Sequence, residues 1–143
     1  GFWADREGNF VVFGLERGRY VLHTAVDLEL ALPRGAEPPA AFVLPNTEVS
    51  TLGGSVEGLE LRLVRAGFLA LRGTDGIAHD SLCKVLDARG ELLAYDGFYS
   101  GHTPHFALPP GPCTLVLCDA EWKELRRYPF EIGAGITELE LGE

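Results

Sequence analysis

The chain has 143 residues, of which 23% are charged and 46% hydrophobic, a composition typical of a folded domain rather than of a disordered segment. Its net charge of -9, with no cluster of basic residues, excludes the concentrated positive surface that nucleic-acid binding requires. No apolar run approaches the roughly 20 residues of a membrane-spanning helix, so the sequence predicts no membrane span.

Apolar and polar residues alternate along most of the chain, and this period of two predicts β-strands and very little helix. Aspartate, glycine and proline interrupt the alternation at short intervals, as between Asp87 and Gly90, where a hairpin is expected. Such spacing is typical of a β-sandwich, so we expect an all-β protein. The strands expected, in chain order, are residues 19–24, 59–63, 68–72, 81–86, 91–95 and 136–141.

Two patterns occur twice in the chain. Phe-Gly-Leu-x-x-Gly-x-Tyr-x-Leu begins at Phe13, and its counterpart Phe-Ala-Leu-x-x-Gly-x-Cys-x-Leu begins at Phe106, an offset of 93 positions. Gly-x-x-Val-x-x-Leu-Glu-Leu begins at Gly53, and Gly-x-x-Ile-x-x-Leu-Glu-Leu begins at Gly133, an offset of 80. Duplicated turns and strands predict two small antiparallel β-sandwiches in tandem.

We call residues 1–65 the first module and residues 66–143 the second module. The unequal offsets indicate extra residues within the first module. They coincide with a proline-rich insertion at about residues 32–45, which we expect to be a surface loop because proline cannot donate to a ladder. The second module has three expected strands ahead of its first pattern and the first module has none. The first module is therefore expected to be incomplete, its missing strands coming from residues ahead of Gly1 or from another chain.

The string that begins at Asp5, Asp-x-x-Gly-x-Phe-x-x-Phe-Gly-Leu-x-x-Gly-x-Tyr-x-Leu, resembles the signature of carboxypeptidase regulatory-like repeats. These are prealbumin-like modules with a carbohydrate-binding-like β-sandwich fold, and they are typically accessory domains. The resemblance therefore implies neither a catalytic residue nor a cofactor. The residues with expected structural roles in turns, strands or core are Gly8, Phe10, Gly18, Tyr20 and Leu22 in the first module and Gly111, Cys113 and Leu115 in the second.

Four aromatic residues are the candidate ligand-binding residues, because exposed rings beside polar neighbours stack on sugars. The alternative is that they fill the core of a small sandwich. These residues are Tyr95, Phe98, Tyr99 and Trp122.

A different chemistry is suggested by His102 and His105, whose spacing suits two imidazole ligands of zinc. No further ligand is evident from the sequence, so no metal is predicted and a surface loop is the alternative. The three cysteines are Cys83, Cys113 and Cys118, too few for a disulfide framework. We expect buried thiols, and the alternative is a single bridge through Cys83.

These observations favour a non-catalytic structural or protein-interaction module of a larger protein, which presents loops or an open sheet edge. The alternative is a carbohydrate-binding module with an aromatic platform, and the third hypothesis is an enzyme with a metal at His102 and His105. The expected partner is another protein or a neighbouring domain of the same polypeptide, with a glycan as the second option. We expect an extracellular or cell-envelope location, and a cytoplasmic one stays open.

Overall fold

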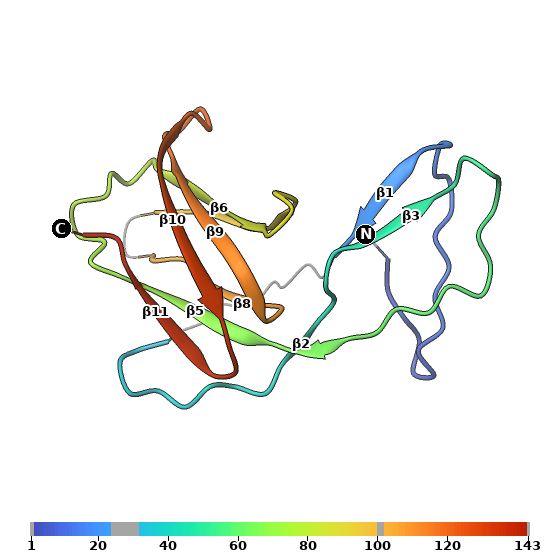
Figure 1. Cartoon of the computed structure of the whole chain (residues 1–143), viewed down its shortest axis with the longest axis horizontal. Coiled ribbons are helices and arrows are strands. Elements are labelled where there is room, and N and C mark those ends of the chain that lie inside the picture. The colour runs from blue at the N-terminus through green and yellow to red at the C-terminus, as the bar shows by residue number, and fades with distance from the viewer. Residues whose placement is uncertain (1, 24–31, 100–101, 143) are drawn as a thin grey trace.

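The structure is a computed structural model that describes residues 2–23, 32–99 and 102–142 (Figure 1). These residues form strands, turns and extended segments without any helix, which confirms the all-β prediction. Accordingly, the described part of the chain contains no helix long and apolar enough to cross a membrane. The strands are β1 (Arg19–Leu22), β2 (Phe42–Val43), β3 (Thr47–Ser50), β4 (Val64–Arg65), β5 (Gly67–Arg72), β6 (Leu82–Asp87), β7 (Leu92–Gly97), β8 (His105–Leu108), β9 (Gly111–Cys118), β10 (Glu124–Ile132) and β11 (Ile136–Glu140).

Strands β5 to β11 make a sandwich of two sheets, on the left of Figure 1. One sheet has the order β10-β9-β6-β7 and the other has the order β11-β5-β8. Antiparallel pairing was expected throughout, and one pair differs, because β5 and β11 run parallel. The predicted hairpin at Asp87–Gly90 is confirmed, since it joins the antiparallel strands β6 and β7.

Strand β5 is apolar on both faces, which explains its unbroken run Phe68-Leu69-Ala70-Leu71. Leu69 and Leu71 point into the sandwich, where both sheets contribute to one core. Phe68 and Ala70 point to the outer side of the three-stranded sheet and are also buried. The buried members of the inner core are Leu69, Leu71, Cys83, Val85, Leu93, Phe98, Phe106, Leu108, Cys113, Leu115, Ile132 and Leu141.

The outer face of β5 is covered by residues 32–46, which we call the strap. The strap contains the proline-rich segment that was expected to be a surface loop; residues 33–40 are mostly exposed and form no strand, whereas the two ends of the strap are buried. Leu32 and Val43 are each 2% exposed, and they pack with Phe68 and Ala70 in a second apolar cluster. Apolar burial therefore holds the strap on the second module, although it belongs to the first by sequence.

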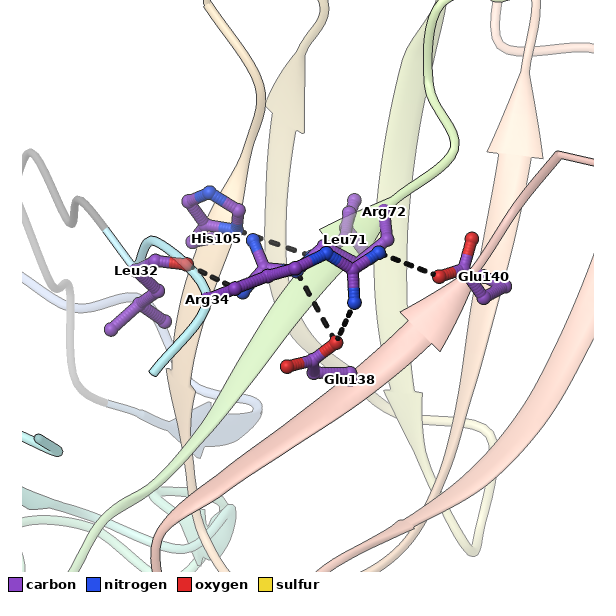
Figure 2. A network of polar contacts seen from close by, with 7 residues as sticks. All are labelled: Leu32, Arg34, Leu71, Arg72, His105, Glu138 and Glu140. Atoms are coloured by element: carbon purple, nitrogen blue, oxygen red, sulfur yellow. Dashed lines mark hydrogen bonds and ion pairs between the residues drawn. The ribbon is translucent and has the colours of Figure 1, made fainter. Parts of the chain in front are cut away.

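Polar contacts fix the start of the strap, as Figure 2 shows. A terminal nitrogen of Arg72 donates a 2.7 Å hydrogen bond to the carbonyl oxygen of Leu32. Arg34 donates to Glu138 at 2.8 Å and to Glu140 at 3.1 Å. Because Arg34 is exposed, each of these ion pairs contributes at most about 1 kcal/mol, less than the apolar contacts beneath them.

The first module has much less regular structure than the second. Strand β1 pairs with β3, and β2 pairs with β4, in two separate two-stranded ladders. Residues 59–63 were expected to be a strand, but they form no ladder with any described residue, so that prediction is wrong. The division into residues 1–65 and residues 66–143 stays a prediction.

A continuous extended run joins the modules, because β4 is separated from β5 by Ala66 alone. Gly67 opens β5 at a point of close approach: a Cβ there would lie 2.2 Å from the carbonyl oxygen of Gly133. A larger residue would clash with that backbone, so glycine is required at the joint.

Two neighbours in the strap should respond very differently to truncation. Val43→Ala removes buried methyl groups and should lower the free energy of unfolding by about 2 kcal/mol. Phe42→Ala is the matched control, since Phe42 is 62% exposed and its loss should change stability by about 0.5 kcal/mol or less. Urea denaturation followed by circular dichroism measures both, and equal effects would contradict the packing of the strap.

Candidate functional site

An open groove of about 920 Å³ lies in the first module. Its lining includes the extended segment from Gly8 to Leu15 and the segment from Gly54 to Leu59. Tyr20 and Leu22 of β1 also line it. These two were expected in a core, but both are only half-buried and belong to neither apolar cluster of the described residues.

The sequence repeat explains what this groove is. Phe13 and Leu15 are 85% and 47% exposed, whereas their counterparts Phe106 and Leu108 are 6% and 1% exposed. The second-module counterparts of Tyr20 and Leu22, which are Cys113 and Leu115, lie in the inner core. The groove is therefore the place where the first module has core residues and no opposing layer among the described residues.

Local hydrogen bonds order the end of the β1–β3 ladder beside the groove. Thr51 closes the β1–β3 ladder: its hydroxyl accepts from the Gly18 amide at 2.9 Å, and its own amide donates to the Gly18 carbonyl at 2.8 Å. The Tyr20 hydroxyl donates to the carbonyl oxygen of Glu16. Phe10 was expected in a strand, but residues 9–13 form none, and its ring contacts that of Phe2 with centroids 5.0 Å apart.

A second candidate is the aromatic pair on the outer face of the four-stranded sheet. Tyr95 lies opposite Lys84 in the β6–β7 ladder and is exposed. Its ring meets that of Trp122 edge to face, with centroids 5.9 Å apart and planes at 78°. The prediction that Phe98 joins this platform is wrong, because its side chain is buried in the inner core.

Trp122 sits in a loop type that occurs three times among the residues that the structure describes. Each loop begins with an aspartate whose Oδ1 accepts from the amides two and four residues later, at 2.9 to 3.0 Å. The three loops start at Asp5, Asp87 and Asp119. The fourth residue of each has a positive φ, in chain order Gly8 (85°), Gly90 (82°) and Trp122 (63°).

Glycine suits this conformation, and the positive φ at Gly8 agrees with the turn expected there. A residue with a side chain is disfavoured at such a φ by about 1–2 kcal/mol. Trp122 adopts this unfavourable φ at the position that is glycine in the other two loops. A residue in such a strained backbone conformation is a candidate for a functional role. Here the strained residue is Trp122, whose exposed indole ring contacts Tyr95.

The third cluster surrounds Asp96, a residue that the sequence did not single out. Its Oδ1 accepts from the Tyr99 hydroxyl at 3.2 Å and its Oδ2 lies 3.0 Å from Nε2 of His102. The rings of Tyr99 and His102 stack with centroids 5.1 Å apart. The Asp96 carboxylate raises the pKa of the exposed Tyr99 phenol, which therefore keeps its proton and donates. The cluster offers hydrogen-bonding groups on the edge strand β7.

The two candidate zinc residues are placed in different roles. His102 faces Asp96, whereas Nδ1 of His105 accepts a 3.2 Å hydrogen bond from the Leu71 amide. Burial, together with Arg72 and His102, lowers the pKa of His105 and favours the neutral ring that this bond needs. Across the described residues, no three histidine, cysteine or acidic side chains come together as a metal site.

All three cysteines are buried free thiols, as expected. Burial, reinforced by the charge of Asp96, raises the pKa of Cys83 from its ordinary 9.0 to about 12. Burial also raises the pKa of Cys113, to about 11, with a further contribution from Asp87. Since the thiolate is the reactive form, neither thiol is suited to nucleophilic chemistry at neutral pH.

Alkaline pH should destabilise the protein through these thiols. A thiol whose pKa is higher in the folded than in the unfolded chain stabilises the fold below pH 9, and this contribution falls as the pH rises toward 12. The slope should be at most about 1.4 kcal/mol per pH unit for each thiol. Urea unfolding at pH 8 to 11 measures it, and Cys83→Ala should flatten the slope. An unchanged slope would contradict the raised pKa.

The strain at Trp122 also gives a measurable signature. Trp122→Ala loses the ring and keeps the unfavourable φ, whereas Trp122→Gly loses the ring and removes the strain. Trp122→Gly should therefore be more stable than Trp122→Ala by about 1 kcal/mol in thermal or urea unfolding. Gly90→Ala, in the loop that starts at Asp87, is the control, and it should lower the free energy of unfolding by a similar amount. Equal stability of the two Trp122 variants would mean that φ is relaxed in solution.

The sequence found part of these sites and missed the rest. Tyr95, Tyr99 and Trp122 were named, but they do not form one platform. Tyr95 contacts Trp122, whereas Tyr99 stacks on His102. Phe13 and Leu15 were not named as candidate site residues, although both belong to the repeated pattern. Comparison with known proteins adds no assignment: no family model, no curated protein and no solved structure matches this chain.

Proposed function

We propose that this protein is a non-catalytic interaction module, whose first module presents an open sheet to an extended segment of a partner protein or neighbouring domain. The observation that carries the proposal is the contrast between exposed Phe13 and Leu15 and their buried counterparts, Phe106 and Leu108. Core-type residues without a covering layer form a surface that is more stable when another chain covers it.

The backbone supports the same proposal. Strands β1 and β3 pair only with each other among the described residues, so each has one edge without a ladder partner. Unpaired strand edges template the addition of another strand, a common mode of peptide recognition in which main-chain hydrogen bonds supply affinity. The groove beside them supplies apolar contacts for alternate side chains.

The second module has the features of a rigid support. Its two sheets enclose a continuous core, and the strap ties the chain between β1 and β3 to its outer face. We further propose that both modules belong to the prealbumin-like, carboxypeptidase regulatory-like class, and that the parent protein is extracellular or in the cell envelope. The two-sheet packing of β5 to β11 supports the first of these statements.

Selection from random decapeptides displayed on phage tests the interaction. Enriched peptides should carry apolar residues at alternate positions and should slow hydrogen exchange within residues 8–22 or 47–59. Leu15→Asp should weaken their binding about tenfold, because it places a charge in the apolar groove. Leu125→Asp is the control, since Leu125 is similarly exposed but lies on β10. Peptides that protect only the second module would overturn the proposal.

The alternative function is glycan binding by Tyr95 and Trp122, and the strained φ of Trp122 is the observation in its favour. A sugar ring would pack on the exposed aromatic faces, with polar groups of β6 and β7 nearby. On a broad glycan panel, Tyr95→Ala and Trp122→Ala should each weaken a positive signal about tenfold. Tyr99→Ala tests the Asp96 cluster separately. Silence of the wild-type protein across the panel would remove this alternative.

A further inference from the structure

The repeat specifies which structural element the groove lacks. An offset of 93 relates residues 12–15 to β8, and an offset of 80 relates residues 56–60 to β11. In the second module β8 and β11 are not neighbours, because β5 lies between them in the order β11-β5-β8. The first module thus contains the two outer strands of a three-stranded sheet as unpaired segments, and no described residue takes the place of the central strand.

The groove lies where that central strand would be. Its lining includes residues 12–15, related to β8, and residues 56–59, most of the segment related to β11. Tyr20 and Leu22 also line it, and their counterparts Cys113 and Leu115 belong to the inner core together with Leu69 and Leu71 of β5. In the second module the equivalent surface is therefore covered by β5.

We propose that the groove is a single-strand slot, which a partner protein fills with one extended segment that has the apolar pattern of β5. This inference rests on the proposed function and specifies its ligand. The segment would run parallel to residues 56–60 and antiparallel to residues 12–15, as β5 does against β11 and β8. It completes two ladders at once, whereas addition to the outer edge of β1 or β3 would complete one.

Register and side-chain pattern follow from the second module. Phe68 lies opposite Ala107 on one side and Ile136 on the other. By the repeat, the corresponding residue of the occupant lies between Gly14 and Val56. The next residue and every second one after it turn toward Tyr20 and Leu22, as Leu69 and Leu71 turn toward the inner core of the second module, and these positions require large apolar side chains.

A partner segment fits this slot better than a second copy of the protein. In a second folded copy β5 is paired along both edges and its apolar residues are 0–2% exposed. Donating it would require unfolding of that copy's sandwich. The slot therefore suits an extended segment that is not already paired in a sheet, and in this proposal a partner protein supplies it.

A synthetic peptide with the sequence of residues 66–72 serves as the probe, because this segment fills the equivalent position in the second module. Fluorescence anisotropy of the labelled peptide should show saturable binding to the full chain. Phe13→Asp should weaken it about tenfold or more, and Trp3→Asp should leave it unchanged, since Trp3 is exposed and lies outside the groove. A scrambled peptide of the same composition should not bind.

Disulfide trapping tests the register. Leu69 pairs with Phe106, so a peptide with cysteine in place of Leu69 should cross-link to Phe13→Cys and not to Trp3→Cys. The three native thiols are buried and do not compete. Protection of β1 or β3 by the peptide without this cross-link would overturn the slot and leave the interaction function standing. Absence of any binding by this peptide and by selected decapeptides would remove both. If the protein alone forms a dimer in which residues 8–15 are protected from hydrogen exchange, a second copy of the protein fills the slot instead of a partner protein.

Discussion

Burial of strand β5 on both faces is the constraint on which the structure depends. Leu69 and Leu71 join the two sheets of the sandwich, while Phe68 and Ala70 hold the strap on the outer side. One strand thus connects the core of the second module to a segment that precedes it by more than twenty residues in the chain. Because apolar burial is the dominant favourable term in folding, the polar contacts of Arg34 and Arg72 orient the strap rather than hold it.

The first module shows what the same repeat becomes without such a strand. Its segments related to β8 and β11 are extended and form no ladder with any described residue, and residues of core type line a groove. The backbone of an isolated outer strand has no ladder partner, so local alternation alone does not produce a strand. This is the reason that residues 59–63 are not a strand although their pattern predicts one. The proposed interaction function and the proposed slot both rest on this asymmetry.

The candidate sites differ in how much of each was visible in the sequence. Tyr95, Tyr99 and Trp122 are aromatic residues with polar neighbours in the sequence, so residue type identifies them as candidates. Phe98 has the same sequence context and is buried, because it takes the inward position at the end of β7. Asp96 escaped notice because a single aspartate carries no pattern, and only the fold brings it to His102 and Tyr99. The strain at Trp122 is a backbone property that becomes evident beside Gly8 and Gly90.

By itself the sequence determined the all-β class, the position of most strands of the second module, the hairpin at Asp87–Gly90 and the buried state of the three thiols. These depend on alternation, turn residues and residue type, which act over a few positions. Tertiary structure decided the place of the strap, the parallel pairing of β5 with β11 and the exposure of Phe13 and Leu15. Each of these depends on which surface lies opposite a segment, and neighbours distant in the chain supply that surface.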